Sequence, residues 1–382
     1  MEQQLFKLFE TRFHTAPQLL VKAPGRANII GEHTDYNNGL VLPFAINRFC
    51  VFVAGKTKEN YACIESVDLE KSTQITLDNL PQKNPSDWTR YFVMALKVLE
   101  KYQYQLKGFQ CMLASDIPIG AGLSSSSAIT CGFIAMLNDL FQLHIPKEKQ
   151  IRLASEAENG TGVQGGMMDQ YAIVMSQKNY ALLLDCLDFS IQLIPNKIEG
   201  AHWVFIDSQV KHNLANTGYN SRRKDCAEGF KIIKNNFKTF KNIRELNEIH
   251  LECLAEYPIY QKRLQYIQKE NERVKTMVAA LVSQNLKKVG ELLTEGHWDL
   301  SKNYEVSCEK LDFLALTAQQ TQGVYGARMM GGGFGGGIIT LIDDSHKNAA
   351  TDILKTYQKK YGQGALYLLN SVAGIETKVV TL

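Results

Sequence analysis

The residues that could do chemistry are concentrated in GRANIIGEHTDYNNG, which runs from Gly25 to Gly39. This stretch contains an arginine (Arg26), two carboxylates (Glu32 and Asp35) and a histidine (His33) within fifteen positions. Apolar runs flank it on both sides and would draw it toward the protein interior. Polar groups in such a place need partners, which raises the question of what these side chains contact.

A second candidate site is PIGAGLSSSSA, residues 118–128, which follows a predicted strand and precedes a predicted helix. Its glycines lack a Cβ, so the backbone can approach a ligand closely. The serines stand at the helix start, where free backbone N–H groups and the helix dipole favour a phosphate. A tight turn with a serine N-cap is the alternative, but a cap needs one serine and four are present. We therefore predict phosphate binding by Gly120, Ala121, Gly122, Leu123, Ser124, Ser125 and Ser126.

Two further glycine-rich stretches say less when taken alone. In AENGTGVQGGMMDQ, residues 157–170, a predicted helix ends near Asn159 and a loop leads to Asp169. A carboxylate in such a loop is often only a turn former. MMGGGFGGG, residues 329–337, satisfies the GxGxxG pattern, but a strand follows it where a dinucleotide site requires a helix. We expect a mobile loop or a close-packed loop that lies against another backbone segment.

The elements that must position these stretches are both strands and helices. Apolar runs and alternation predict strands at 41–46, 49–55 and 109–113, and near Ala181, His202, Ile338 and Ala365. Apolar residues at helical spacing predict helices over 88–102, from Ile129 to Leu140, over 222–238 and through much of 259–298. Strands and helices in both halves predict two α/β lobes, which meet between residues 175 and 200.

Composition and charge exclude several classes of protein. The net charge is +3, from 42 basic and 39 acidic side chains, which gives no argument for nucleic acid or a membrane as a partner. The N-terminus has no signal-peptide pattern, and no run approaches the ~18 apolar residues that span a bilayer. The eight cysteines form no CxxC pair and mostly lie in apolar runs, so we expect reduced thiols in a cytoplasmic protein.

Taken together, the four glycine-containing stretches resemble the motifs of galactokinases, and PIGAGLSSSSA resembles the phosphate loop of the wider superfamily of galacto-, homoserine, mevalonate and phosphomevalonate (GHMP) kinases. The motifs occur in the family's order, from residue 21 to about residue 340. The resemblance implies an α+β fold of two lobes with mixed sheets and an active site in the cleft between them. The first lobe, residues 1–178, would carry the sugar signature, the phosphate loop and the catalytic aspartate. The second, residues 179–382, would carry the last glycine loop.

The resemblance implies that the protein transfers the γ-phosphate of ATP to the C1 hydroxyl of α-D-galactose, the first committed step of galactose catabolism. Asp169 matches the base that accepts the hydroxyl proton, and Arg26 would hold charge beside it. Ser126 and Glu158 match the ligands of Mg²⁺, although Glu156 stands close to Glu158 in the sequence. Ser66 matches a position beside the nucleotide.

The same resemblance places the opening stretch around the sugar, because its polar side chains would then meet hydroxyl groups. The implied sugar-binding residues are Glu32, His33, Thr34, Asp35, Gly166 and Tyr219. The expected partners are galactose and ATP, and we expect a monomer. Two alternatives remain open: a kinase for a related sugar such as N-acetylgalactosamine or arabinose, and a non-catalytic sensor of galactose and ATP.

Two departures from the family pattern stand out. An extra serine, Ser127, occupies the place of a small residue in the family's GLSSSA. The spacing from Glu158 to Asp169 is also one residue shorter than is usual for the family. Both features bear on nucleotide affinity and rate, and they keep the sensor alternative open.

Overall fold

A six-stranded sheet forms the first lobe of a computed structural model that describes residues 1–162, 165–210 and 215–380, with the side chains of 215–217 left out. Its strand order is β13-β1-β3-β6-β4-β5. The strands are β1 (Leu19–Asn28), β3 (Pro43–Lys56), β4 (Tyr61–Ser66), β5 (Lys71–Thr76), β6 (Phe109–Ser115) and β13 (Glu376–Val379). Neighbouring strands run antiparallel except β4 and β6, which are parallel.

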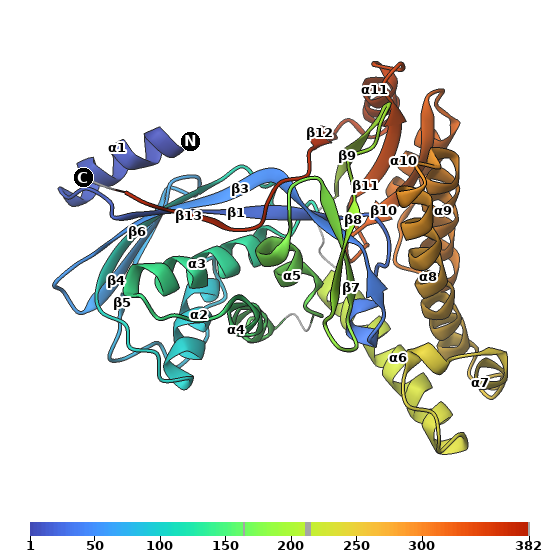
Figure 1. The fold of residues 1–382 in the computed structure, drawn as a ribbon, viewed down its shortest axis with the longest axis horizontal. Coiled ribbons are helices and arrows are strands. Elements are labelled where there is room, and N and C mark those ends of the chain that lie inside the picture. Colours follow the sequence, from blue (N-terminus) through green and yellow to red (C-terminus); the bar gives the residue numbers. More distant parts are fainter. Residues whose placement is uncertain (163–164, 211–214, 381–382) are drawn as a thin grey trace.

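Helices cover both faces of this sheet (Figure 1). The N-terminal helix α1 (Glu2–Phe13) packs on one face through Leu5 and Phe9. The other face is covered by α2 (Arg90–Lys101), α3 (Ser125–Phe141), α4 (Lys147–Asn159) and α5 (Met168–Met175). Strand side chains alternate between the two faces of the sheet. The larger apolar core lies on the face that these four helices cover. Both α3 and α5 contact the inner strands β1 and β3, and α4 packs on α2, α3 and α5.

The second lobe contains a four-stranded sheet of order β10-β11-β9-β12. Its strands are β9 (Ala201–Val210), β10 (Val324–Met330), β11 (Gly336–Asp343) and β12 (Ala365–Leu369). The helices of this lobe are α6 (Ala215–Asn236), α7 (Glu248–Glu252), α8 (Pro258–Val282), α9 (Leu286–Asp299), α10 (Glu309–Gln320) and α11 (Ala349–Tyr361). None of the helices in the described ranges is long and apolar enough to cross a bilayer.

Two sheet pairings link the halves of the chain. A small sheet joins β2 (Leu40–Val41), which directly follows the polar signature, to β7 (Tyr180–Asp185) and β8 (Ile191–Pro195). The last strand, β13, returns to the first sheet and pairs with β1, in register Leu19 with Val379. Residues 376–379 therefore belong to the first sheet and not to the lobe predicted for 179–382; the boundary near 178 itself stays a prediction.

The predicted elements agree with the observed ones in kind. The helix expected over 88–102 is α2, the helix expected to end near Asn159 is α4, and the strand near Ile338 is β11. The strands expected at 41–46 and 49–55 are β2 and one long strand, β3, which continues through the polar residues Asn47 and Arg48. The α+β, two-lobed class is confirmed.

Candidate active site

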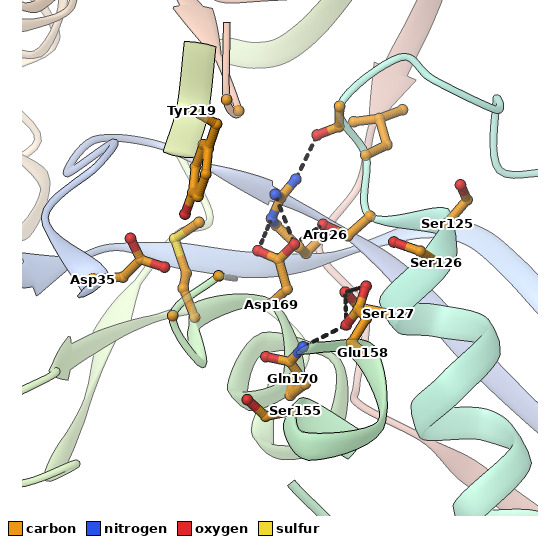
Figure 2. Close-up of a pocket in the computed structure, with 18 of the residues that line it drawn as sticks. Arg26, Asp35, Ser125, Ser126, Ser127, Ser155, Glu158, Asp169, Gln170 and Tyr219 are labelled. Carbon is orange, nitrogen blue, oxygen red and sulfur yellow. Dashed lines mark hydrogen bonds and ion pairs between the residues drawn. The ribbon is translucent and has the colours of Figure 1, made fainter. Parts of the chain in front are cut away.

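A cavity of about 430 Å³ is lined by residues of both lobes. The first lobe contributes the end of β1, the signature loop, the loop before α3, the end of α4 and the start of α5. The second lobe contributes Tyr219 of α6 and the glycine loop between β10 and β11. Figure 2 shows Arg26 and Asp169 facing each other, with Asp35 and Tyr219 to one side and the serines and Glu158 to the other.

Arg26 and Asp169 form a bidentate ion pair at the centre of this cavity. Arg26 Nε lies 2.8 Å from Asp169 Oδ1, and Nη2 lies 3.0 Å from Oδ2. The remaining Arg26 nitrogen donates to the carbonyl of Gly122, and the hydroxyl of Ser124 donates to Asp169. Asp169 stands in the first turn of α5, where the helix dipole favours a negative charge. The predicted pairing of these two residues is confirmed.

The serine loop has the backbone of a ligand cradle. Gly120 and Gly122 adopt φ of +78° and +84°, and Ser124 adopts φ of 60° before α3 begins at Ser125. A Cβ on Gly331 would stand 3.5 Å from Gly122 Cα, so the last glycine loop packs on this one, as expected from its composition. All the predicted phosphate-binding residues line the cavity except Ala121, which is buried beneath the loop.

Glu158, at the end of α4, is held by donors from two neighbouring helices. Ser127 Oγ lies 2.9 and 2.8 Å from its two carboxylate oxygens, and Gln170 Nε2 lies 2.6 Å from Oε2. Burial raises the Glu158 pKa, while a hydrogen bond from Ser126 opposes that shift. Glu156 pairs instead with Lys101 at 2.5 Å, on the outside of the helix. The structure therefore separates the two neighbouring glutamates, and only Glu158 faces the cavity.

Asp35 and His33 form the side of the cavity opposite the serines. Burial, together with the nearby Asp169 charge, raises the Asp35 pKa to about 6. Burial lowers the His33 pKa to about 3, so its imidazole is neutral near pH 7. His33 Nδ1 lies 2.8 Å from the hydroxyl of Tyr36, while Nε2 is buried and has no partner at hydrogen-bonding geometry in the described part of the chain. Gly166 lies directly against Asp35, since a Cβ there would stand 2.2 Å from Asp35 Oδ2.

Glu32 lines the cavity but is already engaged by protein donors. Asn28 Nδ2 lies 2.6 Å from Oε2, Gly331 N lies 3.0 Å from Oε1, and Arg328 of β10 donates to Oε2. The sequence analysis missed Arg328, which stands between an alanine and a methionine in a buried strand and carries no local sign of a site.

Besides Ala121, two further predicted site residues, Thr34 and Ser66, do not line the cavity. The hydroxyl of Thr34 lies 2.8 and 2.6 Å from the carbonyls of Gly31 and Leu40, so Thr34 shapes the signature loop from within. Ser66 is buried at the end of β4, apart from the cavity lining. Their assigned contacts with sugar and nucleotide stay predictions.

Several cavity residues carried no sequence signal. Arg90 and Tyr91 enter from the start of α2, and Ser155 and Asn159 from α4. Arg90 Nη2 donates to the Tyr91 hydroxyl at 2.7 Å, whereas its buried Nε has no hydrogen-bond partner among the described residues. Arg90 and Tyr91 start an amphipathic helix, and in the sequence they look like the solvent-exposed residues of any first helical turn.

Comparisons with known proteins agree with this geometry. Families described as the GHMP kinases N terminal domain and GHMP kinases C terminal match residues 90–177 and 277–360, and the galactokinase galactose-binding signature matches residues 7–56. A crystal structure of mevalonate kinase superposes with a TM-score of 0.68 at 17% identity, covering 93% of this chain and 99% of its own. The fold is therefore that of the GHMP kinases.

Closer relatives narrow the family. Galactokinase from Thermosipho africanus is 38% identical, covering 94% of this chain and 99% of its own; galactokinase from Pyrococcus furiosus is 37% identical, covering 92% and 97%. The crystal structure of Lactococcus lactis galactokinase complexed with galactose superposes with a TM-score of 0.93 at 29% identity, covering 98% of this chain and 99% of its own. The chain belongs to the galactokinase family.

Proposed function

We propose that this protein is an ATP-dependent galactokinase, which transfers the γ-phosphate of ATP to the C1 hydroxyl of α-D-galactose. One observation carries the proposal. The Arg26–Asp169 pair stands in a single cavity between a serine-rich helix start, suited to phosphates, and the polar signature that ends at Asp35. A reaction between a nucleotide and a sugar needs both groups on opposite sides of one reacting centre.

On the sugar side, fixed acceptors and donors would select the hydroxyl pattern. Asp35 accepts, and His33 offers a buried Nε2 for which no described residue stands at hydrogen-bonding geometry. Glu32 is oriented by its three protein donors, so it presents its oxygens in one direction. A site with such buried groups discriminates against a sugar that leaves them unpaired.

At the reacting centre, Asp169 accepts the proton of the C1 hydroxyl. The C1 oxygen bonds to the γ-phosphorus, and the bond from that phosphorus to the leaving ADP oxygen breaks. The two contacts of Asp169 with Arg26 keep the carboxylate facing the cavity, and the always-charged guanidinium stabilises negative charge spreading over the phosphoryl group. Backbone N–H groups at the start of α3 bind the phosphates that remain on the ADP product.

Mg²⁺ is the expected cation of this site, held by Glu158 and Ser126. The oxygen-only donor set fits, because Mg²⁺ uses one or two carboxylates and takes its other ligands from phosphates and water. The described residues contain no cluster of three or more His, Cys, Asp or Glu side chains that could hold a metal alone. When bound, Mg²⁺ neutralises phosphate charge. We also propose that the protein is a cytoplasmic monomer. All eight cysteines are free thiols, as expected for a protein in a reducing compartment.

A panel of sugars assayed for ADP release tests the proposal directly. We expect galactose to be turned over faster than N-acetylgalactosamine, arabinose or glucose. Faster ADP release with another sugar would make that sugar the substrate. Tight binding of galactose and ATP without ADP release would favour a sensor. As a control, Asp169→Ala should lose most ADP release while galactose binding by calorimetry persists.

A further inference from the structure

Ser127, the serine that replaces a small residue of the family pattern, makes an unusual pair of contacts. It is the third residue of α3 and is 2% exposed. Its hydroxyl lies 2.9 and 2.8 Å from the two oxygens of Glu158, which belongs to α4. The contacts therefore join two helices and are not internal to α3 (Figure 2).

The ordinary behaviour of a helical hydroxyl is visible one turn further along α3. Thr130 Oγ1 donates to the carbonyl of Ser126 at 3.0 Å, the common bond from a helical side chain to its own backbone. Ser127 makes no such bond among the hydrogen bonds of the described residues, and serine is a weaker helix former than alanine. Helix formation and packing alone therefore do not favour serine at this place.

The consequence falls on the orientation of Glu158. Gln170 Nε2 holds Oε2 at 2.6 Å from α5, and Ser127 approaches the same carboxylate from α3. Together with the hydrogen bond from Ser126, these two donors from different helices restrict the rotation of the carboxylate plane about its last side-chain bond. A carboxylate that is already oriented loses less conformational freedom on binding a ligand.

We infer that Ser127 is a positioning residue, which fixes the Glu158 carboxylate for the divalent cation that accompanies the nucleotide. The inference rests on the proposed function and extends it to a residue that the family pattern does not supply. It follows the general rule that partners of a metal-binding carboxylate tune affinity for the metal. Ser127 acts through Glu158 and needs no contact with the cation or the phosphates.

The test compares how strongly Mg²⁺ improves nucleotide binding. For each variant, calorimetry gives the dissociation constant of a non-hydrolysable ATP analogue without a divalent cation and with saturating Mg²⁺. We expect Ser127→Ala to reduce the ratio of these two constants by about 10-fold, with the metal-free constant unchanged. Ser127→Thr keeps the hydroxyl and should restore most of the ratio.

Thr130→Val is the matched control, because it removes a hydroxyl from the same helix that contacts only backbone. It should leave the ratio as in the parent. Galactose affinity and melting temperature report folding; should Ser127→Ala fail to fold, Ser127→Cys, a weaker donor of similar size, gives the same comparison. A ratio in Ser127→Ala equal to the parent's overturns the inference, as does an equal fall in Thr130→Val. A parent that gains nothing from Mg²⁺ overturns the proposed cation role itself.

Discussion

Asp35 lowers the stability of the folded protein at neutral pH and at the same time offers an acceptor for a sugar hydroxyl. It is half-buried beside Asp169 and forms no ion pair within the described residues. Burial and the Asp169 charge raise its pKa from 3.8 to about 6, although Arg26 partly opposes the shift. Near neutral pH the folded protein therefore holds an ionised carboxylate in an unfavourable place. A sugar hydroxyl donating to it would relieve that cost.

The pH dependence of this cost can be predicted with its sign. Between pH 3.8 and about 6 the folded state binds a proton that the unfolded state has released, so the contribution of Asp35 to stability falls as pH rises. Above pH 6 the cost is complete. Asp35→Asn should therefore raise the free energy of unfolding at pH 7 by about 1–3 kcal/mol, and the gain should vanish near pH 4.

Urea unfolding without sugar, at pH 4, 5, 6 and 7, measures this difference between parent and variant. Asn also loses an acceptor, so the galactose KM should rise in the same variant. A stability gain that is larger at pH 4 than at pH 7 would contradict the assigned shift.

At the residue scale, sequence reasoning located the groups that stand in motifs. Arg26, Asp169, Glu158 and the serine loop meet in one cavity, as the resemblance implied. Thr34 shares a motif with Asp35 but points into its own loop, because its hydroxyl reaches two backbone carbonyls. A motif names a segment, and only the local backbone decides which of its side chains face the ligand.

At the element scale, the strands with clear apolar runs were predictable, whereas β1 was not. Its residues Lys22, Arg26 and Asn28 interrupt the apolar pattern, yet Arg26 and Asn28 are almost fully buried. They are satisfied by Asp169 and Glu32, which lie outside the strand. The register of β1 against β3 also shifts between Pro24 and Arg26, where the chain enters the cavity. No local pattern could announce either feature.

The loop that leads into α5 carries a prediction of its own. A Cβ on Gly166 would stand 2.2 Å from Oδ2 and 2.9 Å from Cβ of Asp35, so Gly166→Ala must push that side chain aside. Overpacking of this kind costs about 1–3 kcal/mol. We expect the galactose KM to rise about 10-fold or more, which corresponds to about 1.4 kcal/mol, while the ATP KM stays within about 2-fold.

Gly165→Ala is the neighbouring control, since its added Cβ would be 4.0 Å from the Tyr219 hydroxyl, an ordinary contact. Steady-state kinetics with each substrate varied in turn distinguishes the two. Equal effects of both variants, or a rise in the ATP KM alone, would show that Gly166 does not act through Asp35.

At the scale of the whole molecule, a buried chain of charges ties the sugar signature to the second lobe. Arg328 of β10 contacts Glu32 and lies 3.4 Å from Glu270 of α8. Glu270 also accepts from the backbone N–H of Gly31 at 2.8 Å and from Arg273 at 2.7 Å. Arg273 continues to Asp299 of α9 at 2.6 Å. The orientation of Glu32 in the cavity therefore depends on helices that follow it by more than 200 positions.

This network could not be predicted from the sequence. Glu270 stands in KENERVK, where Glu, Lys and Arg alternate as on the exposed face of a helix. Its burial depends on where α8 packs against the signature loop, which is a long-range contact. The sequence predicted the helix, and tertiary packing turned one of its charged positions inward.

Removal of Glu270 should therefore destabilise the protein far more than removal of its neighbour Glu272. Glu270 is fully buried, and Glu270→Ala would leave Arg328 with a single carboxylate and the Gly31 N–H without its acceptor. Breaking a buried pair in this way costs about 3–5 kcal/mol. Glu272 pairs with Lys275 at 2.7 Å on the surface, so Glu272→Ala should cost less than about 1 kcal/mol.

Urea unfolding of both variants, with Glu270→Gln as an intermediate that keeps one acceptor oxygen, measures the difference. Because Glu270 holds both Arg328 and the loop before Glu32, Glu270→Gln should also raise the galactose KM and leave the ATP KM near that of the parent. Similar free energies of unfolding for the Glu270 and Glu272 variants would mean that the buried charge of Glu270 is not needed for stability. An unchanged galactose KM would mean instead that Glu32 is oriented by Asn28 and Gly331 alone, without help from the second lobe's helices.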